Sequence, residues 1–168
     1  MPVFYDICHS IQKHMRNLGL VLVAGIVMLF SGCKKEEKLE TIGDYLTRTG
    51  LKSSATEDPR GFSYKIVSAG TGTAPTLTSK VTLFYKGYLT NGKVFDQTGT
   101  TSNHEAGTPV TFTLNQLISG WQLGLPLIKP GGKIILYLPA SLGYGPYGQG
   151  SIPGNAALIF EITLVSVG

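Results

Sequence analysis

The sequence has few of the residues that usually carry nucleophilic, acid–base or metal chemistry. Of its 168 residues, two are cysteine and three are histidine. Four of these five lie within the first 33 positions, and only His104 lies beyond them. The main part of the chain therefore holds no disulfide, no Cys/His metal site and no Ser-His or Cys-His nucleophile. We expect a function that needs neither a metal nor another cofactor.

Charge is also scarce. Charged residues make up 14% of the chain, and the net charge is +4. The basic side chains form no cluster apart from residues 34–38, "KKEEK", where acidic residues accompany them. A small charge without a basic patch gives little reason to expect nucleic acid as a partner.

The apolar run at residues 20–30, "LVLVAGIVMLF", is too short to cross a bilayer, since a spanning helix needs about 20 residues. Lys13 and Arg16 precede the run, and "FSGC", which ends at Cys33, follows it. This order is typical of a secretory signal, and "FSGC" resembles the site at which bacterial lipoproteins receive their lipid. We expect a signal peptide over residues 1–32 and a lipid on Cys33. A plain transmembrane anchor is the alternative.

Two consequences follow for the N-terminal region. Met15, followed by "RNLGLVLVAG", is a conventional start for such a signal, so residues 1–14 are interpreted as a misassigned beginning. Without residues 1–32 the chain loses two of its 14 basic and one of its 10 acidic residues, which leaves a net charge of about +3. The lipid predicts a cell-envelope protein attached to the outer membrane.

Residues 33–60 are predicted to form a tether that contains one short helix. Leu39, Ile42 and Leu46 recur at helical spacing, and "KSSATEDPRG" follows as a linker rich in turn-forming residues. Residues 61–168 form the main domain, in which β-branched and aromatic runs alternate with turns, and "TNGKVF" contains a hairpin signal. Only "NQLISGWQLGLPLI" has a helical pattern. The predicted class is α+β, an antiparallel sheet folded over one short helix.

Residues 143–160, "GYGPYGQGSIPGNAALIF", place a loop rich in glycine and proline before a strand-like apolar run. Gly and Pro at this density exclude a helix and predict a surface loop. The functional interpretation is a flap beside a pocket, and the flap carries Tyr144. An ordinary long hairpin connection is the alternative.

Four fragments occur in the order "FYKGYLTNGKVFD", "LISGWQLGL", "GYG" and "GSIPGNAALIFEI". Together they resemble the FKBP family of peptidyl-prolyl cis-trans isomerases over residues 61–167. The resemblance implies a curved antiparallel sheet wrapped around one short helix, with an apolar pocket between them. It also implies proline-containing polypeptides, here exported proteins, as substrates and macrolides as inhibitors.

The resemblance also implies the site residues. Val110 stands where the family often has Phe, and Gln116 stands where several members have Glu. The expected catalytic positions are Tyr85, Phe95, Asp96, Trp121, Tyr144 and Phe160. The expected substrate-binding positions are Val110, Gln116, Leu117, Ile118 and Ile152.

An apolar pocket suits this reaction for a physical reason. Rotation about a peptide bond costs about 18–20 kcal/mol because the C–N bond has partial double-bond character. The twisted amide has lost much of the charge separation that water solvates, so an apolar pocket favours it over the planar form. No nucleophile, metal or cofactor is required. The alternative in another class is a non-enzymatic binding module or chaperone with the same fold.

Overall fold

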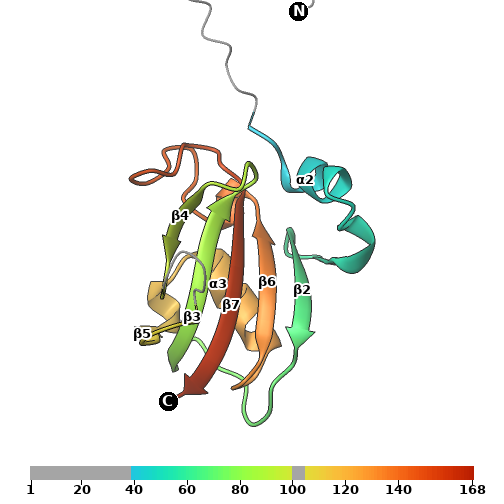
Figure 1. Cartoon of the computed structure of the whole chain (residues 1–168). Coiled ribbons are helices and arrows are strands. Elements are labelled where there is room, and N and C mark those ends of the chain that lie inside the picture. The colour runs from blue at the N-terminus through green and yellow to red at the C-terminus, as the bar shows by residue number, and fades with distance from the viewer. Residues whose placement is uncertain (1–38, 100–104) are drawn as a thin grey trace, which may run out of the picture. The chain divides into compact units, whose positions relative to one another are not determined.

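The computed structural model describes residues 39–99 and 105–168. Within them, seven strands form one antiparallel sheet that curves over a short helix (Figure 1), as predicted. The strands are β1 (Thr56–Asp58), β2 (Phe62–Ser68), β3 (Lys80–Leu89), β4 (Val94–Gln97), β5 (Val110–Thr113), β6 (Lys133–Leu138) and β7 (Leu158–Val167). Their order is β1-β2-β6-β7-β3-β4, and β5 pairs with β3. Because β4 and β5 pair with opposite halves of β3, the two short strands follow one another along the same side of it.

The helical segments are short and lie on both sides of the sheet. In the described parts of the chain, the α-helices are α2 (Ile42–Arg48) and α3 (Ser119–Gly124). The 3-10 turns are η1 (Lys52–Ser54), η2 (Leu114–Gln116), η3 (Leu125–Leu127) and η4 (Ala140–Leu142). Helix α3 faces the core side, and α2 packs on the opposite side.

The close contact between α3 and β6 depends on two glycines. A Cβ atom on Gly120 would collide with Leu138, and one on Gly124 would collide with Leu136. Both leucines are fully buried in the main core. The glycines in this helix thus allow it to approach the sheet closely and place Trp121 at the core.

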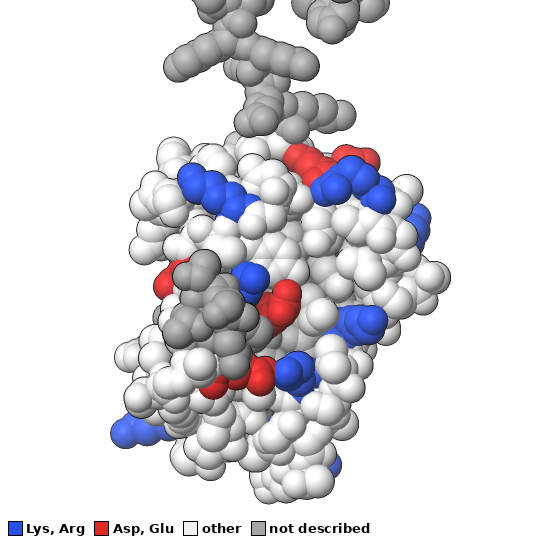
Figure 2. All heavy atoms as spheres, in the orientation of Figure 1, with Lys and Arg blue, Asp and Glu red and all other residues white. Residues whose placement is uncertain are grey.

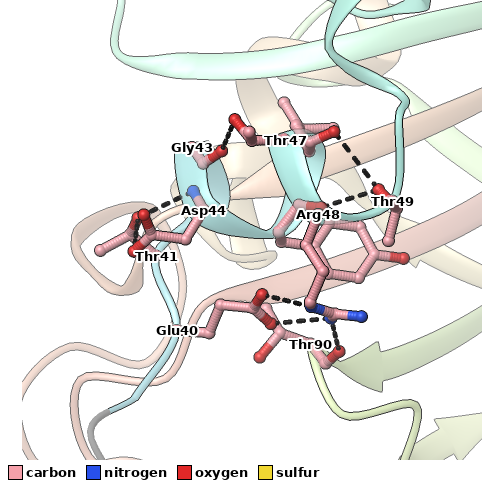
Figure 3. Close-up of polar contacts among 10 residues, drawn as sticks. Glu40, Thr41, Gly43, Asp44, Thr47, Arg48, Thr49 and Thr90 are labelled. Carbon is pink, nitrogen blue, oxygen red and sulfur yellow. Dashed lines mark hydrogen bonds and ion pairs between the residues drawn. The ribbon is translucent and has the colours of Figure 1, made fainter.

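Helix α2 lies where the sequence predicted a helix and is fixed at both ends (Figure 3). At its start, the Thr41 hydroxyl oxygen accepts a hydrogen bond of 3.2 Å from the Asp44 backbone N–H. At its end, Arg48 makes a bidentate ion pair with Glu40 and donates to the Thr90 carbonyl at 3.0 Å. Leu46 is buried against Tyr137 and Ile159 on the outer face of the sheet, so α2 is part of the folded unit.

The segment predicted as a linker is ordered structure. Residues 52–54 form η1, and β1 pairs with β2 across a tight turn. Gly61, with φ of 91°, donates its N–H to the Asp58 carbonyl, and Arg60 pairs with the Asp58 carboxylate at 2.7 Å. The turn-forming residues that indicated a linker therefore close a hairpin, and the sheet begins before residue 61.

The predicted signal peptide, Cys33 and His104 lie outside the described residues. In residues 39–99 and 105–168, no helix is long and apolar enough to cross a membrane. On the face that Figure 2 shows, basic and acidic side chains are interspersed among uncharged ones.

Candidate active site

A cavity of about 200 Å³ lies between α3 and the sheet. Its walls come from β3, β4, β5, β7, the junction before α3, α3 itself and the loop after β6. The lining residues are Tyr85, Phe95, Asp96, Phe112, Leu117, Ile118, Trp121, Tyr144 and Phe160. The structure therefore brings together all six residues expected at the catalytic positions, together with two of the five expected to bind substrate.

Four aromatic rings hold one another in edge-to-face contact at this cavity. The Trp121 ring lies 5.3 Å from the Tyr85 ring and 5.2 Å from the Phe160 ring, and the Phe95 and Phe160 rings are 5.5 Å apart. The interplanar angles are between 76° and 89°. Edge-to-face contacts at these distances are favourable, so the rings form a preorganised apolar wall.

Gly87 makes this ring cluster possible, although the sequence analysis did not single it out. It lies on β3 directly opposite Phe160 of β7. A Cβ atom at Gly87 would lie 2.5 Å from the Phe95 ring and 2.8 Å from the Phe160 ring. The glycine in "YKGY", where a strand would favour a larger residue, was the available sequence signal.

Trp121 carries an unsatisfied polar atom into this apolar setting. The side chain is 4% exposed, and its Nε1–H has no hydrogen-bond partner among the described groups. A buried donor without a partner costs free energy. A ligand with an acceptor in reach of this atom would recover that cost.

The polar side of the cavity is formed by Tyr85 and Asp96. The Tyr85 hydroxyl donates a 2.6 Å hydrogen bond to Asp96 Oδ2. Burial, followed by the bond to Asp96, raises the pKa of Tyr85. Burial, with the nearby charge of Asp96, likewise raises the pKa of Tyr144. Both phenols therefore remain protonated at neutral pH, and Tyr144 presents a hydroxyl that bonds to no described group.

The loop after β6 has a folded conformation that backbone hydrogen bonds stabilise. These bonds lie within the loop and between the loop and η4. The Gly145 N–H donates to the Ala140 carbonyl at 2.8 Å, and the Asn155 N–H donates to the Gly145 carbonyl at 2.9 Å. Gly148 has φ of 68°, and a Cβ atom there would collide with the backbone at Ile152. The glycines thus let the loop fold back on itself. Tyr144 at its base lines the cavity, while Tyr147 farther along is 94% exposed.

Three residues expected to bind substrate do not line the cavity. Gln116 is exposed at the end of η2, and Ile152 is buried in the main core. Val110 packs at the core margin opposite Leu83, while Phe112, two residues along the same face of β5, reaches the cavity. Strand alternation indicates that Val110 and Phe112 share a face but not which of them meets the cavity.

The comparisons with known proteins agree with this architecture. The family model of FKBP-type peptidyl-prolyl cis-trans isomerases matches residues 71–165. A probable FKBP-type peptidyl-prolyl cis-trans isomerase of Haemophilus influenzae is 40% identical over 160 residues, which cover 94% of this chain and 64% of that protein. The outer membrane protein MIP of Legionella longbeachae is 40% identical over 136 residues, which cover 80% of this chain and 56% of that protein.

A solved structure shows the same fold. The crystal structure of FkpA from Escherichia coli superposes with a TM-score of 0.67 at 36% sequence identity, covering 75% of this chain and 57% of that chain. The chain spans less than two thirds of the length of each of the two relatives and of the solved chain.

Proposed function

The chain belongs to the FKBP-type peptidyl-prolyl cis-trans isomerase family, and from this membership we propose that it accelerates rotation about X-Pro peptide bonds in polypeptides. The observation that carries the proposal is the cavity beneath Tyr144, in which four aromatic rings and the Tyr85–Asp96 pair converge. Its volume of about 200 Å³ is several times the ~30 Å³ that one water occupies in the liquid, which leaves room for a proline ring.

In the proposed mechanism, the proline ring rests on Trp121 between Tyr85, Phe95 and Phe160. Water is excluded from the planar amide, which loses more solvation than the twisted amide does. The pocket therefore binds the transition state more tightly than the ground state, and this difference lowers the barrier. An acceleration of about 10⁵ requires about 7 kcal/mol, at about 1.4 kcal/mol for each factor of ten.

Two donors are proposed to hold the substrate backbone. Ile118 and Tyr144 line the cavity. Neither the Ile118 N–H nor the Tyr144 hydroxyl donates to another described group. We assign them to the carbonyl groups on either side of the rotating bond. Asp96 orients the Tyr85 ring through their hydrogen bond. The same apolar cavity is proposed to accept macrolide inhibitors.

The proposed activity is tested with a short X-Pro peptide whose trans form alone is cleaved by a protease. The slow phase of cleavage reports isomerisation, which takes tens to hundreds of seconds without a catalyst. We expect the protein to shorten this phase in proportion to its concentration. An unchanged slow phase at saturating protein would favour a binding module that lacks catalysis.

We further propose that the protein is anchored in the cell envelope, at the outer membrane, by lipid on Cys33. The proposal rests on the "FSGC" sequence after a short apolar run, and the name of the Legionella relative supports it. Since a single acyl chain binds membranes only marginally, stable anchoring requires more than one chain on this residue. The variant Cys33→Ala should move from the membrane fraction to the soluble fraction while the isomerase activity is retained. A processed variant that stays in the membrane fraction would contradict this anchor.

A further inference from the structure

The folded domain begins closer to Cys33 than the sequence predicted. Leu39 is the first described residue, and Glu40 after it pairs with Arg48, whose guanidinium also donates to the Thr90 carbonyl. Leu39 is six positions beyond Cys33. Six residues span at most about 20 Å when fully extended. A lipid on Cys33 would therefore hold this point of the domain within about 20 Å of a membrane surface.

The chain enters the domain at one end of the sheet. Leu39 lines a small cavity of about 80 Å³ together with Leu89, at the end of β3, and Pro153, in the loop after β6. In Figure 1 that loop and the start of α2 lie at the same end of the sheet, and the C-terminus lies at the opposite end. We call the end formed by Leu39, the β3–β4 turn and the loop after β6 the tether end.

The length of β7 separates the tether end from the opposite end. Leu158 at the start of β7 pairs with Leu89, and Val167 at its end pairs with Val81. Because a strand rises about 3.3 Å per residue, these two ends of β7 are about 30 Å apart. A lipid on Cys33 thus holds the tether end near the membrane, while the opposite end is free to point away from it.

The loop after β6 adds an exposed aromatic ring to the tether end. Tyr147 in this loop is 94% exposed. The two arms of the loop pack closely, since a Cβ atom on Gly154 would collide with the Pro146 carbonyl oxygen. Tyr147 therefore belongs to the folded loop that meets Leu39 through Pro153. A tyrosine ring has an apolar body and a polar tip, and tyrosine is enriched where bilayers meet water.

We propose that the tether end faces the lipid surface that holds Cys33, and that Tyr147 lies among the lipid headgroups. The inference rests on the proposed lipid on Cys33, because that lipid brings the domain to the membrane. Tyr144, three residues before Tyr147, lines the catalytic cavity. The cavity therefore lies close to the same surface, and the isomerase acts on polypeptides that are held at the membrane.

The test uses the full chain, processed and lipidated, in vesicles of phosphatidylethanolamine and phosphatidylglycerol that contain a lipid with a spin-labelled headgroup. Processing removes Cys8, and Cys33 carries the lipid, so an introduced cysteine is the reactive thiol of the mature chain. Tyr147→Cys and Val165→Cys each receive a bimane label, whose fluorescence a nearby spin label quenches. Val165→Cys is the matched control, because Val165 is 41% exposed and lies near the opposite end of β7.

We expect the spin-labelled lipid to quench at least about half of the fluorescence at position 147 and less than about a tenth at position 165. This difference would place the tether end at the membrane. Equal quenching at both positions, stronger quenching at position 165, or no quenching at position 147 would overturn the proposal.

Two parallel measurements separate this inference from the proposals on which it rests. Flotation with the vesicles reports the lipid, and a chain that does not float would contradict both the lipid on Cys33 and the orientation. A chain that floats without the expected difference in quenching would contradict the orientation alone. Isomerisation of a soluble X-Pro tetrapeptide should be unchanged in both labelled variants. Its absence in the wild type would contradict the proposed catalysis and leave the orientation standing.

Discussion

The hydroxyl of Tyr85 donates a 2.6 Å hydrogen bond to Asp96 Oδ2, and this bond links β3 to β4 at the mouth of the aromatic cavity. Asp96 lies on β4 opposite Gly87, one residue after Phe95. The bond therefore fixes two of the cavity walls at once. In our account Asp96 acts on the substrate through Tyr85 rather than by its own charge.

This role predicts that the two residues are energetically coupled. Tyr85→Phe and Asp96→Leu should each lower kcat/KM by about three- to tenfold, the cost of one hydrogen bond. The double variant should be no slower than the slower single variant. Asp96→Asn, whose side-chain oxygen still accepts from Tyr85, should retain most of the activity. Fully additive losses would show that Asp96 meets the substrate directly.

The second prediction concerns the apolar wall. Phe95→Ala removes the ring that packs against Phe160, so it admits water to the cavity and should lower kcat/KM by about 100-fold. Val94→Ala is the matched control, because Val94 precedes Phe95 in β4 and is 36% exposed. Its activity should equal that of the wild type. A loss of less than about threefold for Phe95→Ala would argue against stabilisation by desolvation.

The third prediction separates the flap hydroxyl from the rest of its ring. Tyr144→Phe keeps the ring and loses one donor, so kcat/KM should fall by about three- to tenfold, less than for Phe95→Ala. Tyr147→Phe removes the same group from the same loop at a side chain that is 94% exposed, and it should have no effect. Equal kcat/KM values for Tyr144→Phe and Tyr147→Phe would show that the Tyr144 hydroxyl makes no hydrogen bond with a substrate carbonyl.

The fourth prediction concerns the packing of β3 against the ring cluster. Gly87→Ala forces a methyl group against Phe95 and Phe160, and overpacking of this kind lowers the free energy of unfolding by about 1–3 kcal/mol. Activity should fall with it, because the rings must move. Gly43→Ala, in a helix with room for a methyl group, should instead be neutral or stabilising. Chemical denaturation together with the peptide assay measures both effects. Unchanged stability and activity in Gly87→Ala would show that the rings are not tightly packed.

Most of the fold could be predicted from the sequence because its strands have strong local signals. Alternating residues such as Val81 and Leu83 indicate a strand with one buried face, and the buried helix around Trp121 breaks that pattern. The resemblance to a known family placed six catalytic candidates that the structure brings together. Local patterns do not encode which side chain reaches a cavity, so Phe112 was missed in favour of Val110.

The region before residue 61 could be predicted less well. Its helix has a periodic signal, but its packing against Tyr137 and Ile159 depends on residues about 90 or more positions away. The pairing of β1 with β2 could not be predicted from the sequence either, because a hairpin turn and a linker use the same residue types. Tertiary contacts decide between these alternatives.

The pH dependence of isomerisation tests the central claim most directly. Burial raises the pKa of Tyr85 and of Tyr144 above the ordinary tyrosine value of about 10, so both phenols stay protonated across the neutral range. We predict that kcat/KM for an X-Pro tetrapeptide is well above the uncatalysed rate and nearly constant between about pH 6 and 8, with no effect of His104→Ala. A steep pH–rate profile over this range, or loss of activity in His104→Ala, would show that acid–base chemistry carries the reaction.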